Sequence, residues 1–248
     1  GTFGPERAFL AKASMENSGW PEPQWDLSDG EIERWVTTSQ FGVELCGAAI
    51  RADAYGYVAM GDPKLAARLA HSDASMTHRK NGIYGAMFNA AAIASAPLVS
   101  RPVDAFALAL KVLPVKSRFY QVVADSLDIV ESAGSFESAY DAIHDKYAAY
   151  GFCRLYQEAG TMINSARFAE STGEGISLQV SQGNDTDSYG ATIGSILGAF
   201  FGPEGLEEQW LAPFNNEIHT TLASFHETRL DAVAERMGKL PKIVPADR

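Results

Sequence analysis

The residues with the clearest chemical potential lie in the segment 183–190, Gly-Asn-Asp-Thr-Asp-Ser-Tyr-Gly. Asp185, Asp187 and Ser188 supply two carboxylates and a hydroxyl within four residues. Hard divalent cations such as Mg²⁺ prefer oxygen ligands of this kind. The segment therefore predicts a metal site at the start of a helix. The alternative is that the aspartates only cap that helix and complement its dipole.

The helix that must hold these residues is indicated by its apolar spacing. Large apolar residues recur at helical intervals at Ile193, Ile196, Leu197, Phe200 and Phe201. Small residues share the opposite face and would let another helix approach closely; they are Ala191, Gly194, Ser195, Gly198, Ala199 and Gly202. The pattern predicts a rigid, largely buried helix behind the aspartates.

The remaining pattern is helical almost throughout. Asp62 followed by Pro63 is typical of a helix start, and helices are also expected over 83–95, over 119–130 and from a Ser135 cap to Tyr147. No hairpin or βαβ pattern emerges. We expect an all-α, compact multi-helix orthogonal bundle.

Composition limits the classes of partner. The 248 residues are 46% hydrophobic, enough for one large core, and lack a run of eighteen apolar residues. The net charge of −11 opposes binding to nucleic acid or to an anionic membrane. An acidic protein still binds a diphosphate where metals and helix N-termini supply positive potential.

The two cysteines, Cys46 and Cys153, lie in apolar contexts expected to be helical and lack metal-ligand spacing. Buried free thiols in a cytoplasmic protein are therefore expected. The sequence does not indicate an oligomeric state.

Two blocks resemble one known family. The run Gly-x-Asp-Thr-Asp-Ser before a Gly/Ala-spaced helix resembles the C-terminal signature of the ADP-ribosylglycohydrolase family, all-helical enzymes related to the dinitrogenase-reductase-activating glycohydrolase. The family's central segment is similar, in the same order, to Gly47-Ala-Ala-Ile-Arg51, Gly56, Gly61-Asp62-Pro63, Thr77-His78 and Asn81-Gly-Ile-Tyr-Gly-Ala86. The likeness runs from about Phe41 to the C-terminus.

The resemblance implies a metal-dependent hydrolase that cleaves the glycosidic bond of an ADP-ribosylated substrate. Its partners would be ADP-ribose or an ADP-ribosylated protein, and its cofactors two Mg²⁺ or Mn²⁺ ions. Asp185, Asp187 and Ser188 would be metal ligands. The alternatives are a hydrolase of another riboside and a non-catalytic member kept for binding or structure.

Five further residues are candidates for substrate binding. His78 matches a family histidine in the ligand cleft, the alternative being a solvated loop histidine, and Asp53 matches the family more loosely. Tyr84 and Tyr189 are candidates for stacking on adenine. Glu158 precedes the metal motif near a cleft-closing loop, the alternative being a carboxylate on a helix surface.

The chain departs from the family pattern in its N-terminal part. The family's Thr-Asp-Asp motif, which completes a two-metal site, does not occur in the sequence. Residues 1–40 are poorly patterned and are expected to be the remnant of a longer chain, while 41–248 form the ADP-ribosylglycohydrolase-like helical domain. The general acid/base is then expected in the missing part.

Overall fold

The computed structural model describes residues 28–39, 42–220, 222 and 225–240. These residues form helices and connecting turns, with one isolated bridge between Glu217 and Arg229, so the predicted all-α fold is confirmed. The α-helices are α2 (Asp29–Ser39), α3 (Asp53–Val58), α4 (Pro63–Ala74), α5 (Asn81–Ser95), α6 (Pro102–Leu110), α7 (Arg118–Ser132), α8 (Phe136–Tyr147), α9 (Tyr156–Phe168), α10 (Thr172–Ser181), α11 (Thr186–Phe201), α12 (Glu208–Leu211) and α13 (Leu230–Lys239). Short 3₁₀ helices are η1 (Cys46–Arg51), η2 (Ala96–Leu98), η3 (Ala148–Tyr150), η4 (Pro203–Gly205) and η5 (Ala212–Phe214).

The predicted helix starts are present as capped N-termini. The Asp62 carboxylate accepts a hydrogen bond of 3.0 Å from the Leu65 amide, and Pro63 opens α4. Ser135 and Ser138 form a reciprocal capping box at the start of α8. These side chains satisfy amides that have no partner inside the helix, which is why the boundaries were predictable from sequence.

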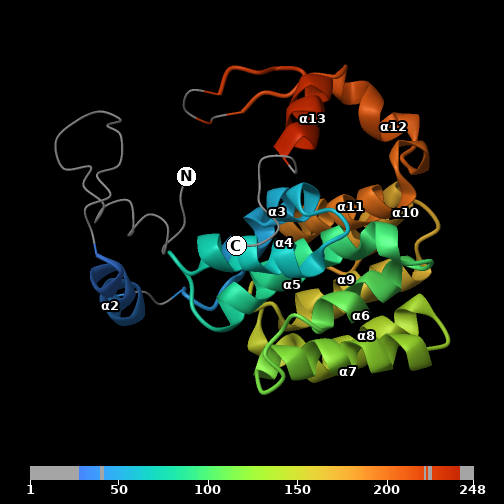
Figure 1. The fold of residues 1–248 in the computed structure, drawn as a ribbon. Helices are drawn as coiled ribbons and strands as arrows, with labels where there is room; N and C mark the ends of the chain where they lie inside the picture. Colours follow the sequence, from blue (N-terminus) through green and yellow to red (C-terminus); the bar gives the residue numbers. More distant parts are fainter. Residues whose placement is uncertain (1–27, 40–41, 221, 223–224, 241–248) are drawn as a thin grey trace.

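Helix α5 is the centre of the core. Most of its residues are buried, and it packs against α3, α4, α6 and η1. In Figure 1, α3 and α4 lie on one side of α5, while α7 and α8 lie together at the far edge of the bundle. Helix α9, also buried along most of its length, packs against α7, α8 and α10.

Helix α11 packs closely against α10 through its small residues. A Cβ atom added at Gly194 would lie 3.2 Å from the Ile176 side chain, and one at Gly190 would lie 3.3 Å from Val180. The predicted close approach of a second helix is confirmed at Gly194, whereas a Cβ atom at Gly198 would meet nothing within 4 Å. On the other helix, Gly175 gives room for the buried side chain of Leu197.

A buried amide network fixes the turn that precedes α11. Gln182 accepts from Asn164 at 2.9 Å and donates to the Ser165 hydroxyl at 2.9 Å. Gln179 accepts from Ser165 and donates to the Thr161 hydroxyl. All five side chains are buried, so each lost hydrogen bond would leave a polar group unsatisfied. The network joins α9 to α10 and fixes the end of α10, after which the 183–185 turn begins.

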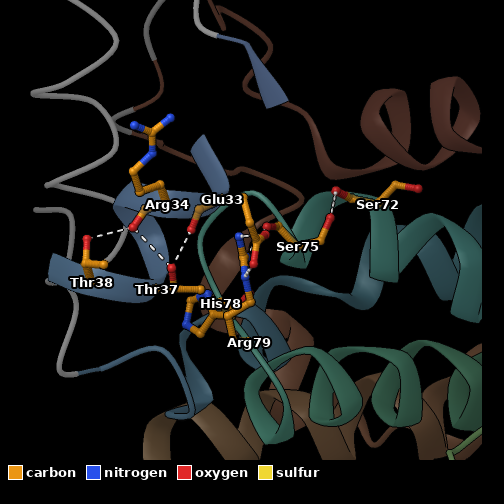
Figure 2. Close-up of polar contacts among 8 residues, drawn as sticks. All are labelled: Glu33, Arg34, Thr37, Thr38, Ser72, Ser75, His78 and Arg79. Carbon is orange, nitrogen blue, oxygen red and sulfur yellow. Dashed lines mark hydrogen bonds and ion pairs between the residues drawn. The ribbon is translucent and has the colours of Figure 1, made fainter. Parts of the chain in front are cut away.

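Helix α2 falls inside the stretch 1–40 that was expected to be poorly patterned; residues 1–27 and 40–41 lie outside the described residues. Figure 2 shows that Arg79 reaches from the loop after α4 to Glu33 on α2, with a closest N···O distance of 2.5 Å. Arg79 also donates to the Ser75 and His78 carbonyls. One side chain therefore ties α2 to the loop that carries His78. Whether 1–40 is a remnant of a longer chain stays a prediction.

Among the described residues, no helix combines the length and apolar character needed to cross a membrane.

Candidate functional site

Three side chains from distant parts of the chain converge at the N-terminus of α11. The Cys46 and Cys153 sulfurs each lie 3.4 Å from the same Asp185 oxygen, Oδ2. The two sulfurs and the carboxylate oxygen all lie within 4.8 Å of one another. We call Cys46, Cys153 and Asp185 the thiol–carboxylate cluster. Both cysteines are free thiols, as expected, but Cys153 is only half-buried and lies in a turn before α9, so the expectation of a buried helical thiol was wrong for it.

The backbone around the cluster is arranged to bring these groups together. Asp185 occupies the N-cap position of α11, yet its side chain makes no capping hydrogen bond and contacts the thiols instead. The Cys46 amide donates to the Cys153 carbonyl at 3.0 Å, which joins the two cysteine loops. Cys153 itself has a φ of 62°, unfavourable for a residue with a side chain. Strained backbone of this type is found preferentially at functional sites.

Glu158 and Tyr189 lie behind the cluster, and each is 1% exposed. Glu158 accepts a hydrogen bond from the Cys153 amide through Oε1, while its Oε2 is buried without a partner. The Tyr189 hydroxyl is likewise buried and unpaired. The alternative of a surface carboxylate at Glu158 was therefore wrong. Tyr189 is enclosed by protein and has no open face for an adenine in this conformation.

Burial keeps the acidic groups of this region protonated more strongly than in water. Burial raises the pKa of the Cys153 thiol to about 11; Asp185 adds to this rise, and the hydrogen bond with Cys46 opposes it. Burial also raises the pKa of the Cys46 thiol, and both Cys153 and Asp185 add to that rise. Desolvation also raises the pKa of Glu158 and of the Tyr189 hydroxyl. At neutral pH without a metal, the thiols are therefore neutral donors to Asp185.

The other two predicted metal ligands, Asp187 and Ser188, follow Asp185 on the first turn of α11. Asp187 is exposed on the first turn of α11, and Ser188 is half-buried. Asp187 is not part of the close group formed by Cys46, Cys153 and Asp185. Oxygen donors on this turn suit a hard cation, whereas two sulfurs beside Asp185 do not. The donor set thus fits an Mg²⁺ pair only in part.

His78 belongs to a hydrogen-bonded network that joins the two halves of the central block. It is 1% exposed, and its Nδ1 lies 2.9 Å from the Thr77 hydroxyl. Arg51 donates to the same hydroxyl at 3.0 Å and forms a salt bridge of 2.8 Å with Asp73. His78 packs against Gly82 at the start of α5. It is therefore buried within the bundle and is not a solvated loop histidine.

Asp53 lies on α3 beside the middle of α11. Its Oδ2 accepts a hydrogen bond of 2.9 Å from Ser195, and its Oδ1 is buried without a partner. Ser195 is ten residues after Asp185, which places it roughly 15 Å along the helix. The structure therefore does not bring Asp53 to the cluster. Burial raises its pKa from 3.8 to about 6, although the Ser195 hydrogen bond opposes the shift.

This shift makes the stability of the fold depend on pH in a defined direction. The pKa of Asp53 is higher in the folded protein than in the unfolded chain, so ionisation of this carboxyl lowers the free energy of unfolding. The loss is complete above about pH 6 and absent below about pH 4, where the carboxyl is protonated in both states. Asp53→Asn is expected to raise the free energy of unfolding by about 1–2 kcal/mol at pH 7. A pKa shift of about two units corresponds to about 3 kcal/mol, which is the largest gain that removing the ionisable group can give. Urea unfolding at several pH values should show this gain disappearing near pH 4.

The exposed Asp128→Asn provides the control for that measurement, since its carboxylate lies on the surface of α7. It should leave the free energy of unfolding nearly unchanged at every pH. A gain for Asp53→Asn that is equal at pH 4 and pH 7 would contradict the assignment of the effect to ionisation of Asp53.

A cationic and aromatic groove is lined in part by residues that neighbour Cys46 and Cys153 in the sequence. Two adjoining cavities of about 450 and 320 Å³ share Glu44, Asn81, Arg118 and Tyr156. The first also contains Tyr150 and Arg154, and the second contains Lys80 and Tyr84. Asn81 donates to both Glu44 and the Tyr156 hydroxyl, which fixes the floor of the groove. We call these eight residues the arginine–tyrosine groove.

Two residues of the groove lie next to the cysteines of the cluster in the sequence. Glu44 is two residues before Cys46, and Arg154 directly follows Cys153. Tyr84 is the predicted substrate residue that the structure places in this groove. Sequence reasoning missed both cysteines and both arginines as site residues, because their positions depend on contacts between segments that are distant in the sequence. The one available signal was that Cys46 directly precedes the family-like segment that begins at Gly47.

Comparison with known proteins agrees with the two sequence blocks. Among curated proteins, none matches the chain. The model of the ADP-ribosylglycohydrolase family matches residues 4–242. The likeness therefore begins well before Phe41, the start that the quoted motifs had suggested. Because this match covers nearly all of the 248 residues, the chain belongs to the ADP-ribosylglycohydrolase family.

Proposed function

We propose that this protein is a metal-dependent hydrolase that cleaves the glycosidic bond linking ADP-ribose to a modified protein or small molecule. The observation that carries the proposal is Asp185. This aspartate of the family-like motif stands at the N-terminus of α11, and its carboxylate is used neither for capping nor, among the described residues, for a salt bridge. A carboxylate held in this way is available to a cation or to a developing positive charge.

The arginine–tyrosine groove is the proposed place for the ADP portion of the substrate. Arg118 is the first residue of α7, so its guanidinium and the helix N-terminus both favour an anion. Arg154 lies across the same cavity. In a protein of net charge −11, this local gathering of cations suits a diphosphate. Tyr84 and Tyr156 offer aromatic surface to the adenine.

In the proposed reaction, the chain's carboxylates stabilise positive charge at the anomeric carbon. Glycoside hydrolysis passes through an oxocarbenium-like state, which nearby negative groups favour. Asp185 is the proposed principal group, and Glu158 holds the Cys153 loop against it. We propose Asp187 and Ser188 as additional oxygen ligands on the same helical turn. A bound divalent metal would orient the ribose hydroxyls and activate a water molecule.

His78, Asp53 and Tyr189 are not assigned to this site. His78 and Tyr189 are buried, and Asp53 lies beside a distant turn of α11. We also propose a cytoplasmic location, supported by two free thiols that lie close together without a disulfide.

The test is release of ADP-ribose from a panel of substrates. The full chain is incubated with arginine- and serine-linked ADP-ribosylated peptides, and separately with free nucleosides, in the presence of Mg²⁺, Mn²⁺ or Zn²⁺. Release from at least one peptide, abolished by a chelator, is the expected result. Cleavage of nucleosides alone would identify a hydrolase of another riboside. Binding of ADP-ribose without any release would identify a non-catalytic member, and both outcomes would overturn the proposal.

Removing the arginines should weaken substrate binding more than catalysis. Arg118→Ala and Arg154→Ala are each expected to raise KM for an ADP-ribosylated peptide by about 5–20-fold, because each removes a charged hydrogen bond of about 1–2 kcal/mol. The value of kcat should change by less than about threefold. Steady-state kinetics measures both quantities. Arg101→Ala, which removes an exposed arginine paired with Asp104 away from the groove, is the matched control.

A further inference from the structure

The thiol–carboxylate cluster is an unusual donor set for a family expected to use Mg²⁺ or Mn²⁺. Magnesium binds oxygen, whereas thiolate sulfur is the preferred ligand of zinc and other soft cations. Cys46 and Cys153 come from segments 107 residues apart, and both point at one oxygen of Asp185. Two cysteines and one carboxylate form a three-ligand set of the type found where zinc keeps a fourth position open.

The spacing of the three donor atoms matches tetrahedral coordination. Zinc lies about 2.3 Å from sulfur and about 2.0 Å from a carboxylate oxygen, so a tetrahedral centre separates its sulfur and oxygen ligands by about 3.5 Å. The two S···O distances here are both 3.4 Å. The sulfurs lie within 4.8 Å of each other, as two ligands of one ion must.

A second observation indicates a cation at this place. Among the described residues, neither Asp185 nor Glu158 takes part in a salt bridge, although Glu158 is 1% exposed. Glu158 also keeps an unpartnered buried oxygen next to the Cys153 loop, and the Tyr189 hydroxyl beside it is unpartnered too. A buried acidic group such as Glu158 is costly without a positive partner, and a cation bound by the neighbouring cluster would lower that cost.

We infer that Cys46, Cys153 and Asp185 form a site for one thiophilic divalent cation, with Zn²⁺ as its biological occupant. On coordination, each thiol releases one proton to solvent and binds as a thiolate. Glu158 positions the Cys153 loop and does not itself bind the ion. The site leaves one coordination position open at the N-terminus of α11. This assignment concerns metal choice and does not depend on hydrolysis.

The test is a Co²⁺ titration of the full chain after reduction and removal of metals with a chelator. Cobalt replaces zinc in sulfur sites and then shows a sulfur-to-metal charge-transfer band in the near ultraviolet. The expected result is this band at one equivalent of Co²⁺, its loss on adding Zn²⁺, and no change with excess Mg²⁺. Cys46→Ser and Cys153→Ser should each weaken Co²⁺ binding at least about tenfold. The double variant should lose the band.

Asp128→Asn is the matched control, because Asp128 is an exposed aspartate on α7 and lies outside the cluster; the charge-transfer band of this variant should be unchanged. A second readout uses the unmodified protein, so that a folding defect in a variant does not decide the result. Zn²⁺ should slow alkylation of both thiols, and Mg²⁺ should not. A protein without the charge-transfer band, or thiols that Zn²⁺ fails to protect, would overturn the inference. Hydrolysis supported by Mg²⁺ would leave the proposed function intact in that case.

Discussion

Asp185→Asn is expected to lower kcat/KM for release of ADP-ribose by at least about 100-fold, the scale of losing one group that stabilises charge in the transition state. Asparagine has nearly the same shape and can still accept a hydrogen bond from Cys46 or Cys153. It lacks the negative charge that would hold a cation or stabilise an oxocarbenium-like state. The fold should therefore persist while the activity is lost. Steady-state kinetics on an ADP-ribosylated peptide, with circular dichroism to monitor folding, measures the two effects separately.

Two variants distinguish a local effect of Asp185 from a general effect of charge. Asp128→Asn removes an exposed carboxylate from α7 and should leave kcat/KM within about twofold of the unmodified protein. Asp187→Asn removes the neighbouring carboxylate of the same motif. The decrease in kcat/KM for this variant should lie between the decreases for Asp185→Asn and Asp128→Asn. If Asp185→Asn keeps full activity at every metal concentration, the central role of Asp185 is wrong.

The predictable part of the fold is local. The starts of α4 and α8 were encoded within four residues, as Asp62 before Pro63 and as Ser135 before Ser138. The extent of α5 and α7 followed from apolar residues at helical spacing, because a helix in a bundle must bury one face. By contrast, α2 has few apolar residues to bury, which is why its pattern was overlooked.

The site was less predictable because its parts are distant in sequence. The position of Asp185 at a helix start followed from the pattern of α11. No periodicity could bring Cys46 and Cys153 to its side chain, since that contact depends on how η1 and the turn before α9 pack on the bundle. Burial was similarly invisible for Glu158, a residue type seldom found in protein interiors. Charged and sulfur-containing residues in unexpected places are therefore the features that sequence patterns miss here.

The second large effect is expected at Gly56, where α3 contacts α5. A Cβ atom at this position would lie 2.5 Å from the Ile93 Cβ and 2.9 Å from the Ala90 carbonyl oxygen. Both atoms are fixed by the backbone of α5, so a changed rotamer cannot relieve the overlap. Gly56→Ala should push α3 away from α5 and lower the free energy of unfolding by about 3 kcal/mol. The unfolding midpoint should fall by roughly 6–12 °C.

Gly198→Ala is the matched control, because a Cβ atom added there meets nothing within 4 Å and the residue lies inside α11. Alanine should raise the free energy of unfolding by about 0.5–1 kcal/mol at that position, through its better helix propensity and a less flexible unfolded chain. Urea unfolding of both variants therefore tests the same Gly→Ala change at two positions, with changes in the free energy of unfolding expected to be of opposite sign. Equal and small effects at the two positions would show that α3 does not pack against Ile93 as closely as the structure has it.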